Sequence, residues 1–518
     1  MDSWLSCGLS RAKEWISIQA VIRRQLLACL LPILFSLASL SAQTVRTVIR
    51  QASIVDGSGQ PAFSADLAFQ DGWIIAVGQV EPRPGDRVIA ARRGRVLAPG
   101  FIDIHNHSQQ GLLEKPQAES QVSQGIATLV VGADGGGPFP PAAYRKRLAQ
   151  KGTAVNVALF AGHGRLRRMA MGNDYKRPAT PEEVQVMKAL LRLAFQQGVF
   201  GLSSGLEYDP GFYSQTDELV ELAREAASWG GFYMSHIRDE EDGFIQALDE
   251  AIEIGRRARI PVQISHIKLG NTRVWGRTEE VFQKMAWAAA EGVDVLADCY
   301  PYNAWASNLS ILIPSRRFDD RQEVAEAFEK IGGAHNVLVT RYSPDPNYEF
   351  KNLTQIAQER KISEVDLFIE MMDKGGAGIV GRSMNPQDVE RFYRHPRVMV
   401  ASDGGIDSRH PRMSGTFPRV LGRFVRQNGW FSLEEAIRKM TSMPAARLGL
   451  NDRGLIRAGF RADLTLFDPG KIIDHSDFQN PGRLSEGVEL VLVNGVAVWE
   501  KGGATGQLPG AQLVPASR

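Results

Sequence analysis

Five polar residues of this chain could together hold a metal ion and activate water. His105 and His107 form a His-x-His pair, His236 and His266 each follow a serine at the end of an apolar run, and Asp403 ends another such run. Residues two apart in a strand point the same way, so both imidazoles of the pair can face one ion. Imidazole nitrogens and carboxylate oxygens are the ligands of hydrolytic zinc sites. The pattern therefore predicts one shared metal site with hydrolytic chemistry.

Composition excludes several other classes of protein. The 518 residues carry 60 Lys and Arg against 58 Asp and Glu, so the formal net charge is only +2. Such a balance predicts no nucleic-acid partner, because binding to phosphates needs a clearly basic surface. The 3 cysteines exclude a disulfide scaffold and a zinc finger built on cysteines. Histidines and carboxylates must therefore hold any metal.

The first 42 residues resemble an export signal. Basic residues up to Arg24 precede an apolar run from Leu26 to Leu40, and small residues follow it. This order predicts a secretory signal peptide over 1–42, cut near residues 41–43, and a mature protein that is periplasmic or extracellular without stable membrane insertion. The alternative is an uncleaved membrane anchor, although the run is short for a span and contains Pro32. Cleavage would leave Cys299 as the mature chain's one cysteine.

Eight apolar segments alternate with amphipathic helices after Pro99-Gly100, which predicts an α/β fold, a (β/α)8 TIM-like barrel over residues 98–450. An insertion over about 330–390 interrupts the last two units. In such barrels the active site lies at the carboxyl ends of the strands, which is where the five polar residues stand. The predicted strands are Phe101–Ile104, Ala127–Val131, Val155–Phe160, Phe200–Ser203, Gly231–Ser235, Pro261–Ser265, Val293–Ala297 and Arg397–Ala401.

Short β-like runs separated by turns flank the barrel on both sides, over residues 43–97 and 451–518. We therefore expect one small β-sandwich domain built from both ends of the mature chain.

Several motifs resemble one known family in the order in which they occur. The opening stretch Pro99–His107 is similar to that of the metal-dependent amidohydrolase superfamily, and the other phrases resemble its D-aminoacylase branch, the N-acyl-D-amino-acid deacylases. The resemblance runs from about Val45 to the C-terminus. Its further stretches are Gly198–Tyr213, Tyr233–Glu240, Val262–Lys268, Met399–Gly404, Pro411–Gly422 and Arg461–Phe467.

The resemblance implies roles for the five residues. His105, His107, His236 and His266 would be ligands of one or two Zn²⁺ ions or of other divalent metals. Asp403 would contact the metal and act as the general base that takes a proton from the attacking water and passes it to the leaving nitrogen.

One position departs from the family pattern. Many members of the branch carry a metal-bridging cysteine near the end of the second strand, where this chain has Asp134. Other members of the superfamily bridge with a carboxylate from a neighbouring strand, and here Glu207 follows the fourth. We hypothesise that Glu207 supplies the bridging carboxylate, with Asp134 as the alternative.

The resemblance also implies groups that bind substrate. Lys268 matches a lysine that binds the substrate carboxylate, and Tyr208 matches a tyrosine that could donate to the developing oxyanion. His163 either lines the pocket or packs in the structure around it. Three arginines and a second tyrosine are weaker candidates, since an arginine on the loop after the eighth strand is more often a solvated charge. They are Arg238, Arg409, Arg412 and Tyr300.

The leading functional hypothesis is hydrolysis of the amide bond of a small-molecule N-acyl-D-amino acid to a D-amino acid and a carboxylate. One alternative is a related amidohydrolase that acts on dipeptides or cyclic amides. Another is a non-catalytic metal-binding homologue. The full set of histidines and Asp403 favours an enzyme, whereas the absence of the usual cysteine keeps the non-catalytic alternative open.

Overall fold

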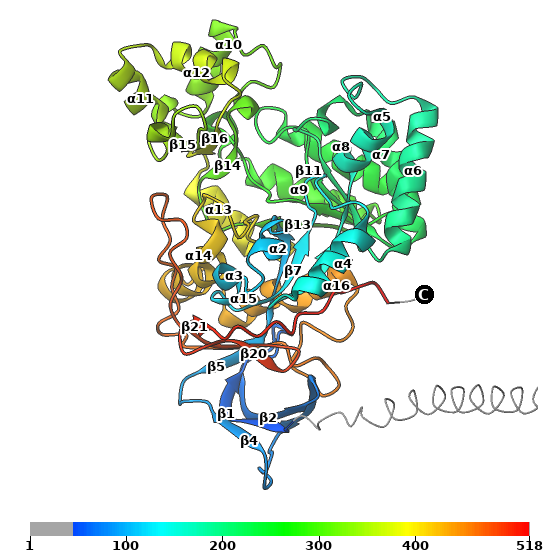
Figure 1. Ribbon diagram of the computed structural model, residues 1–518, viewed down its shortest axis with the longest axis vertical. Helices are drawn as coiled ribbons and strands as arrows, with labels where there is room; N and C mark the ends of the chain where they lie inside the picture. Colours follow the sequence, from blue (N-terminus) through cyan, green and yellow to red (C-terminus); the bar gives the residue numbers. More distant parts are fainter. Residues whose placement is uncertain (1–44, 517–518) are drawn as a thin grey trace, which may run out of the picture. The chain divides into compact units, whose positions relative to one another are not determined.

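The computed structural model describes residues 45–516 (Figure 1). The predicted signal peptide, 1–42, lies outside the described residues. The chain divides into two units after Arg46, and all elements below belong to the second unit. Within residues 45–516, none of the helices has the length and apolar character needed to cross a bilayer.

Eight parallel strand positions form the predicted barrel, and their order follows the chain. The third position is divided at Phe160 into two short strands. The barrel closes between its first and last strands, where the amide of Asp403 donates to the carbonyl of His105 (2.9 Å) and the amide of His107 donates to that of Gly404 (2.6 Å). The strands are β6 (Phe101–Asn106), β7 (Ile126–Val131), β8 (Asn156–Leu159), β9 (Ala161–Gly162), β10 (Gly201–Gly205), β11 (Phe232–His236), β12 (Val262–Ile264), β13 (Val295–Cys299) and β17 (Val398–Val400).

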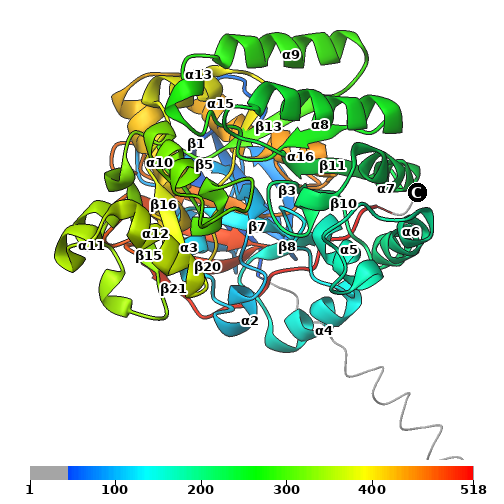
Figure 2. The same cartoon turned by 90° about the horizontal axis from the view of Figure 1, so that it is seen from above.

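Helices pack around the outside of these strands (Figure 2). The helix α6 begins after Thr180, which forms a reciprocal capping box with Glu183. The helix α8 buries an apolar face that includes Phe244 and Leu248. The helices of the barrel are α2 (Gly111–Glu114), α3 (Glu119–Val122), α4 (Pro141–Lys151), α5 (His163–Met171), α6 (Pro181–Gln196), α7 (Thr216–Ser228), α8 (Phe244–Ala258), α9 (Thr278–Ala290), α13 (Pro386–Arg394), α14 (Arg412–Arg419), α15 (Leu433–Met440) and α16 (Ser442–Leu448). The helix α14 continues as the π-helix η6 (Val420–Gln427), and 3-10 turns are η1 (Gly211–Tyr213) and η2 (Thr272–Val274).

The insertion between β13 and β17 begins earlier than the sequence predicts. Its first strand starts at Trp305, not near residue 330, and a small antiparallel sheet in the order β14-β16-β15 forms its centre. The segment Trp305–Asn308 contains two polar residues in four, so its strand signal is weak. The elements are β14 (Trp305–Asn308), η3 (Leu309–Leu312), α10 (Arg321–Lys330), η4 (Ala334–Asn336), β15 (Val337–Arg341), η5 (Pro346–Tyr348), α11 (Leu353–Arg360), α12 (Glu364–Asp373) and β16 (Gly378–Gly381).

Both ends of the described chain meet in one nine-stranded sheet, in the order β21-β20-β19-β18-β5-β1-β2-β3 with β4 on β1. The two layers of the expected sandwich are therefore parts of one sheet, which curls so that Trp73 pairs with Arg461. Strand β5 of this sheet continues directly into β6, the first strand of the barrel. At the junction, Gly100 is packed so closely against Ala127 that a Cβ added to residue 100 would lie 2.4 Å from the Cβ of Ala127. The strands are β1 (Thr47–Ile54), β2 (Phe63–Gln70), β3 (Trp73–Gly78), β4 (Arg87–Ala90), β5 (Val96–Pro99), β18 (Leu464–Phe467), β19 (Val488–Val493), β20 (Val496–Glu500) and β21 (Gly503–Ala504).

Candidate functional site

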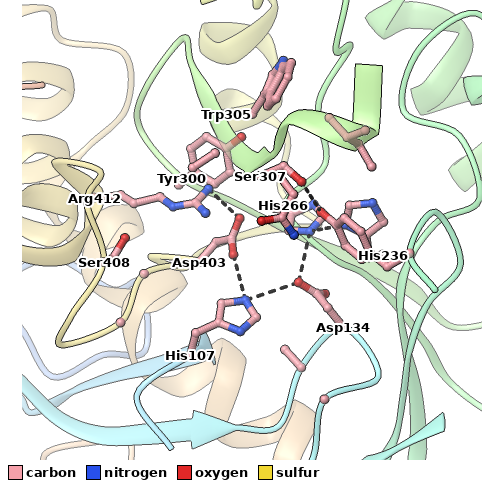
Figure 3. Close-up of a pocket in the computed structure, with 18 of the residues that line it drawn as sticks. His107, Asp134, His236, His266, Tyr300, Trp305, Ser307, Asp403, Ser408 and Arg412 are labelled. Atoms are coloured by element: carbon pink, nitrogen blue, oxygen red, sulfur yellow. Dashed lines mark hydrogen bonds and ion pairs between the residues drawn. The ribbon is translucent and has the colours of Figure 1, made fainter. Parts of the chain in front are cut away.

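A cavity of about 890 Å³ opens at the carboxyl ends of the barrel strands. In Figure 3 the labelled side chains of His107, Asp134, His266 and Asp403 gather around one point, and Trp305 and Ser307 of the insertion lie above them in this view. His105 is fully buried and does not line the cavity. The predicted metal ligands that line the cavity are His107, Asp134, Glu207, His236, His266 and Asp403.

Two histidines of β6 and Asp403 form one half of the polar cluster. The Nε2 atoms of His105 and His107 are 3.3 Å apart. The Asp403 Oδ1 atom lies 3.1 Å from Nε2 of His107 and 3.4 Å from Nε2 of His105. Strand pleating puts the two imidazoles on one side, as the spacing predicts, and closure of the barrel brings Asp403 against them.

His236 and His266 form the other half, at the ends of β11 and β12. The Nδ1 atom of His236 lies 2.9 Å from Nε2 of His266. These strands are direct neighbours in the sheet, which explains how residues thirty positions apart bring their rings into contact. The two halves together assemble all four predicted histidines and Asp403 in one place.

Asp134 lies between the two halves. Its Oδ2 atom is 3.3 Å from Nε2 of both His105 and His107, and 3.6 Å from Nε2 of His266. Burial raises the pKa of a carboxyl, but here the charges of His105 and His266 outweigh burial and hold the pKa of Asp134 well below its usual value. Asp134 therefore stays ionised, as a metal ligand must.

Three non-glycine residues of the site have left-handed backbone angles, namely Asp134 (φ 51°), His266 (φ 33°) and Asp403 (φ 48°). Side chains with a Cβ rarely adopt such angles, and they concentrate at functional sites. The turn of the backbone at each strand end aims these side chains into the cluster.

Arg412 forms an ion pair with the general-base candidate, Asp403. Its Nη1 atom lies 2.6 Å from Oδ2 of Asp403, and its guanidinium lies over the ring of Tyr300 at 4.7 Å. Burial alone would raise the pKa of Asp403, but the charges of Arg412 and His266 lower it well below its usual value. Asp403 is therefore ionised and able to accept a proton.

Tyr208 lies over the ring of His236, with the ring centroids 4.4 Å apart. Its hydroxyl accepts a hydrogen bond from Ser307 of the insertion at 3.5 Å. Burial, with the charges of Glu207 and Asp134, raises the pKa of Tyr208 well above its usual value. The phenol therefore keeps its proton and can donate a hydrogen bond beside the cluster.

Lys268 lines the cavity but already has partners. Its ammonium forms a close ion pair with Glu240 and lies 2.9 Å from Nδ1 of His266. It also lies 5.9 Å from the centroid of the Tyr300 ring, on which Arg412 packs. Lys268, Tyr300 and Arg412 thus form one cationic wall beside the histidine cluster.

The structure does not bring three of the predicted substrate contacts to the cavity. His163 binds Glu218 at 2.8 Å in a buried ion cluster, so its role is structural. Arg238 pairs with Glu250 at 2.8 Å, and Arg409 pairs with Glu349 at 2.6 Å. None of the three lines the cavity, because each has a carboxylate partner elsewhere.

Other residues of the site were missed by sequence reasoning. Glu240 stands four residues after His236 in a stretch that resembles the family, and that spacing could have revealed it. Asp298 was missed because β13 ends two residues later than predicted. Glu241 also lines the cavity, and burial together with the charge of Glu207 raises its pKa to about 8. Trp305 and Arg341 come from the insertion, whose start the sequence does not mark.

The cluster suits a divalent cation. Among the described residues, His105, Asp134, His266 and Asp403 each offer one ligand atom within 4.8 Å of the others. Tetrahedral ligands about 2.1 Å from zinc lie about 3.4 Å from one another, close to the 3.1–3.6 Å separations found in this cluster. The Oδ1 atom of Asp134 is buried and makes no hydrogen bond. A bound cation would supply the missing partner.

Comparisons with known proteins show which family the chain resembles. Residues 375–499 match the model of the amidohydrolase family. The N-acyl-D-aspartate deacylase of Alcaligenes xylosoxydans xylosoxydans is 36% identical, over 90% of this chain and 95% of its own length. The D-aminoacylase of the same organism is 34% identical, over 91% of this chain and 98% of its own.

A solved structure shows the same likeness. The N-acyl-D-glutamate deacylase of Bordetella bronchiseptica, complexed with zinc and a phosphonate inhibitor that mimics the tetrahedral intermediate, is 34% identical, with a TM-score of 0.82. The match covers 91% of this chain and 100% of that one. The chain therefore belongs to the N-acyl-D-amino-acid deacylases, the D-aminoacylase branch of the metal-dependent amidohydrolases.

Proposed function

We propose that the protein is a metal-dependent hydrolase that cleaves the amide bond of N-acyl-D-amino acids to a D-amino acid and a carboxylate. The observation that carries this proposal is the cavity itself, which places the cluster of histidines and Asp403 next to the cationic wall of Lys268, Tyr300 and Arg412. A hydrolytic centre beside cations suits an amide substrate with a free carboxylate. The preference for D-amino acids is inferred from the relatives.

Zinc is the expected cofactor, as one or two ions, and other divalent metals can take its place. His105, His107, His236, His266, Asp134 and Asp403 would hold it, since their nitrogen and oxygen atoms face the cluster. When bound, the metal lowers the pKa of water toward neutrality and polarises a carbonyl.

The residues around the cluster would transfer the proton, stabilise the oxyanion and bind the substrate. Asp403 accepts the proton of the attacking water and delivers it to the leaving nitrogen, a role that its position against His107 and its ionised state permit. Tyr208 donates its hydroxyl proton as a hydrogen bond to the developing oxyanion. Arg412 and Lys268, which both lie against the ring of Tyr300, bind the free α-carboxylate and so orient the scissile amide.

The protein is expected to act outside the cytoplasm, because a basic segment, an apolar run and small residues open the sequence in the order of a signal peptide. An uncleaved leader would instead anchor it to the membrane. The N-terminal residue of the exported protein, read by sequencing, distinguishes the two, with a start near residue 43 expected for cleavage.

A substrate panel on the purified, metal-loaded enzyme tests the proposal. We expect turnover of N-acetyl-D-amino acids and little turnover of the L enantiomers. Asp403→Asn should reduce kcat by about 10²–10⁴-fold, because general-base catalysis is lost. Turnover of dipeptides or hydantoins without N-acetyl-D-amino acids would support the alternative amidohydrolase. Unchanged hydrolysis by Asp403→Asn would reject the mechanism, and a metal-binding chain without any turnover would be a non-catalytic homologue.

A further inference from the structure

Each of the three buried histidines of the site has a carboxylate behind it. One ring nitrogen of each faces the cluster, and the other lies near a carboxylate: His105 Nδ1 lies 3.3 Å from Asp298 without a hydrogen bond, and His266 Nδ1 lies 3.0 Å from Glu240, beside the ammonium of Lys268. In a neutral imidazole one nitrogen donates a proton and the other keeps a lone pair. A carboxylate accepts the proton and so fixes which nitrogen is left for a metal.

The same reasoning places Glu207 behind His236. The Oε2 atom of Glu207 lies 2.8 Å from Nε2 of His236, whereas the other nitrogen, Nδ1, faces His266. The two nitrogens of an imidazole point in different directions, so Glu207 lies on the side of the ring away from the cluster. In the part of the chain that the structure describes, neither group of possible metal ligands includes Glu207.

Asp134 has the opposite placement. Its Oδ2 atom contacts both halves of the cluster, at 3.3 Å from His105 and His107 and at 3.6 Å from His266. Its Oδ1 atom is buried and makes no hydrogen bond. We propose that Asp134 is the ligand shared by two metal positions, that Glu207 positions His236 instead of bridging, and that the centre consequently favours harder metal ions than a thiolate-bridged centre would. This proposal rests on the proposed function as a metal-dependent hydrolase.

A second group of possible ligands, His236, Glu240 and His266, competes with this assignment. Lys268 argues against it. Its ammonium forms a close ion pair with Glu240 and lies 2.9 Å from Nδ1 of His266, so a positive charge already fills that side of the rings. A metal ion there would be repelled by the ammonium.

The chemical consequence follows from the donor atoms. The cluster contains imidazole nitrogens and carboxylate oxygens. Cys299 is the one cysteine among the described residues; it is buried, and its thiol donates a hydrogen bond to the carbonyl of Tyr300. Thiolate ligands favour zinc, whereas carboxylates suit harder ions such as Mn²⁺. A centre that shares a carboxylate should therefore discriminate less strongly in favour of zinc.

The first experiment replaces the proposed shared oxygen by sulfur. Asp134→Cys has nearly the same size, and in the cobalt(II)-loaded variant we expect a thiolate-to-cobalt charge-transfer band in the near-ultraviolet. The wild-type protein is the matched control, because it contains Cys299 and should show no such band. Equilibrium dialysis against competing Zn²⁺ and Mn²⁺ should give a zinc-to-manganese affinity ratio at least about tenfold higher in Asp134→Cys. A cobalt-loaded variant without the band, or with an unchanged ratio, would overturn the proposal.

A second experiment needs no introduced thiol. In the wild-type protein saturated with Mn²⁺, two ions that share a carboxylate should give an exchange-coupled electron paramagnetic resonance signal. Asp134→Asn should abolish the coupling, and Glu207→Gln should retain it, with circular dichroism to check the fold of both. Coupling that survives in Asp134→Asn, or is lost only in Glu207→Gln, would contradict the assignment. These readouts need no substrate, so an enzyme that passes them and cleaves no N-acyl-D-amino acid refutes only the proposed function.

Discussion

At the residue scale, the structure separates candidates that the sequence leaves equivalent. Arg409 and Arg412 stand three residues apart after the eighth strand, and both were possible substrate contacts. Arg409 binds Glu349 of the insertion, whereas Arg412 is 6% exposed and contacts Asp403. Only a side chain that faces the cavity can bind the substrate, so the burial and partners of each arginine decide its role.

This difference gives a testable prediction for the two arginines. Arg412→Gln should raise KM for an N-acyl-D-amino acid by about 10- to 100-fold, since a charge-assisted hydrogen bond contributes about 1.5–3 kcal/mol. Arg409→Gln is the matched control and should leave KM unchanged. Substrate in which an amide replaces the α-carboxylate should bind both Arg412→Gln and the wild type equally weakly. If Arg412→Gln raises KM for the N-acyl-D-amino acid and for its α-amide by the same factor, Arg412 does not contact the carboxylate.

At the element scale, helix α13 ends against α9 through an aromatic contact. His395, which follows α13, stacks on Phe282 with ring centroids 4.2 Å apart. Burial, with the nearby charges of Lys439 and Arg397, lowers the pKa of His395 to about 4. The unfolded chain has the ordinary histidine pKa of about 6.5, so it binds more protons than the folded chain between these values. Stability should therefore fall as the pH decreases from about 6.5 to 4.

His395→Phe tests this contribution, because it keeps the stacking and removes the titrating nitrogen. Between pH 7 and pH 4.5 the free energy of unfolding of the wild type should fall by about 1 kcal/mol more than that of His395→Phe. The effect is modest since the ring is only half-buried and solvent screens the charges. Urea unfolding at both pH values measures the difference. Parallel pH profiles for the two proteins would show that His395 is protonated as easily in the fold as in the unfolded chain.

At the scale of the whole molecule, the C-terminal segment completes the barrel wall beside β8. The amide of Gly510 donates to the carbonyl of Thr153, and the amides of Val157 and Leu513 donate to the carbonyls of Ala511 and Val157, at 2.8–2.9 Å. A Cβ on residue 510 would lie 2.0 Å from the carbonyl oxygen of Val155, so only glycine allows this approach. A segment more than 350 residues away in sequence thus supports a strand of the barrel.

Removing this segment should destabilise the barrel. A chain that ends at Leu508 loses these backbone hydrogen bonds and the burial of Leu513, about 3–6 kcal/mol in total, and its Tm should fall by several degrees. A chain that ends at Leu513 keeps all of them and should melt like the wild type. Gly510→Val should act like the longer truncation. If both truncated chains melt at the wild-type temperature in calorimetry, the segment makes no contribution to stability.

The sequence by itself determined the barrel and most of the candidate metal ligands, because both depend on local patterns. Apolar runs that end in histidine or aspartate mark the carboxyl ends of strands, and strand pleating puts His105 and His107 on one side. Tertiary structure alone decided which carboxylates face the cluster. Glu207 and Asp134 both follow strands, and the direction in which the ring of His236 points and the contacts of Asp134 with both halves of the cluster separate them. Contacts between distant segments, such as that of Arg412 with Asp403, leave no mark in local sequence, because packing fixes them only once the barrel has closed.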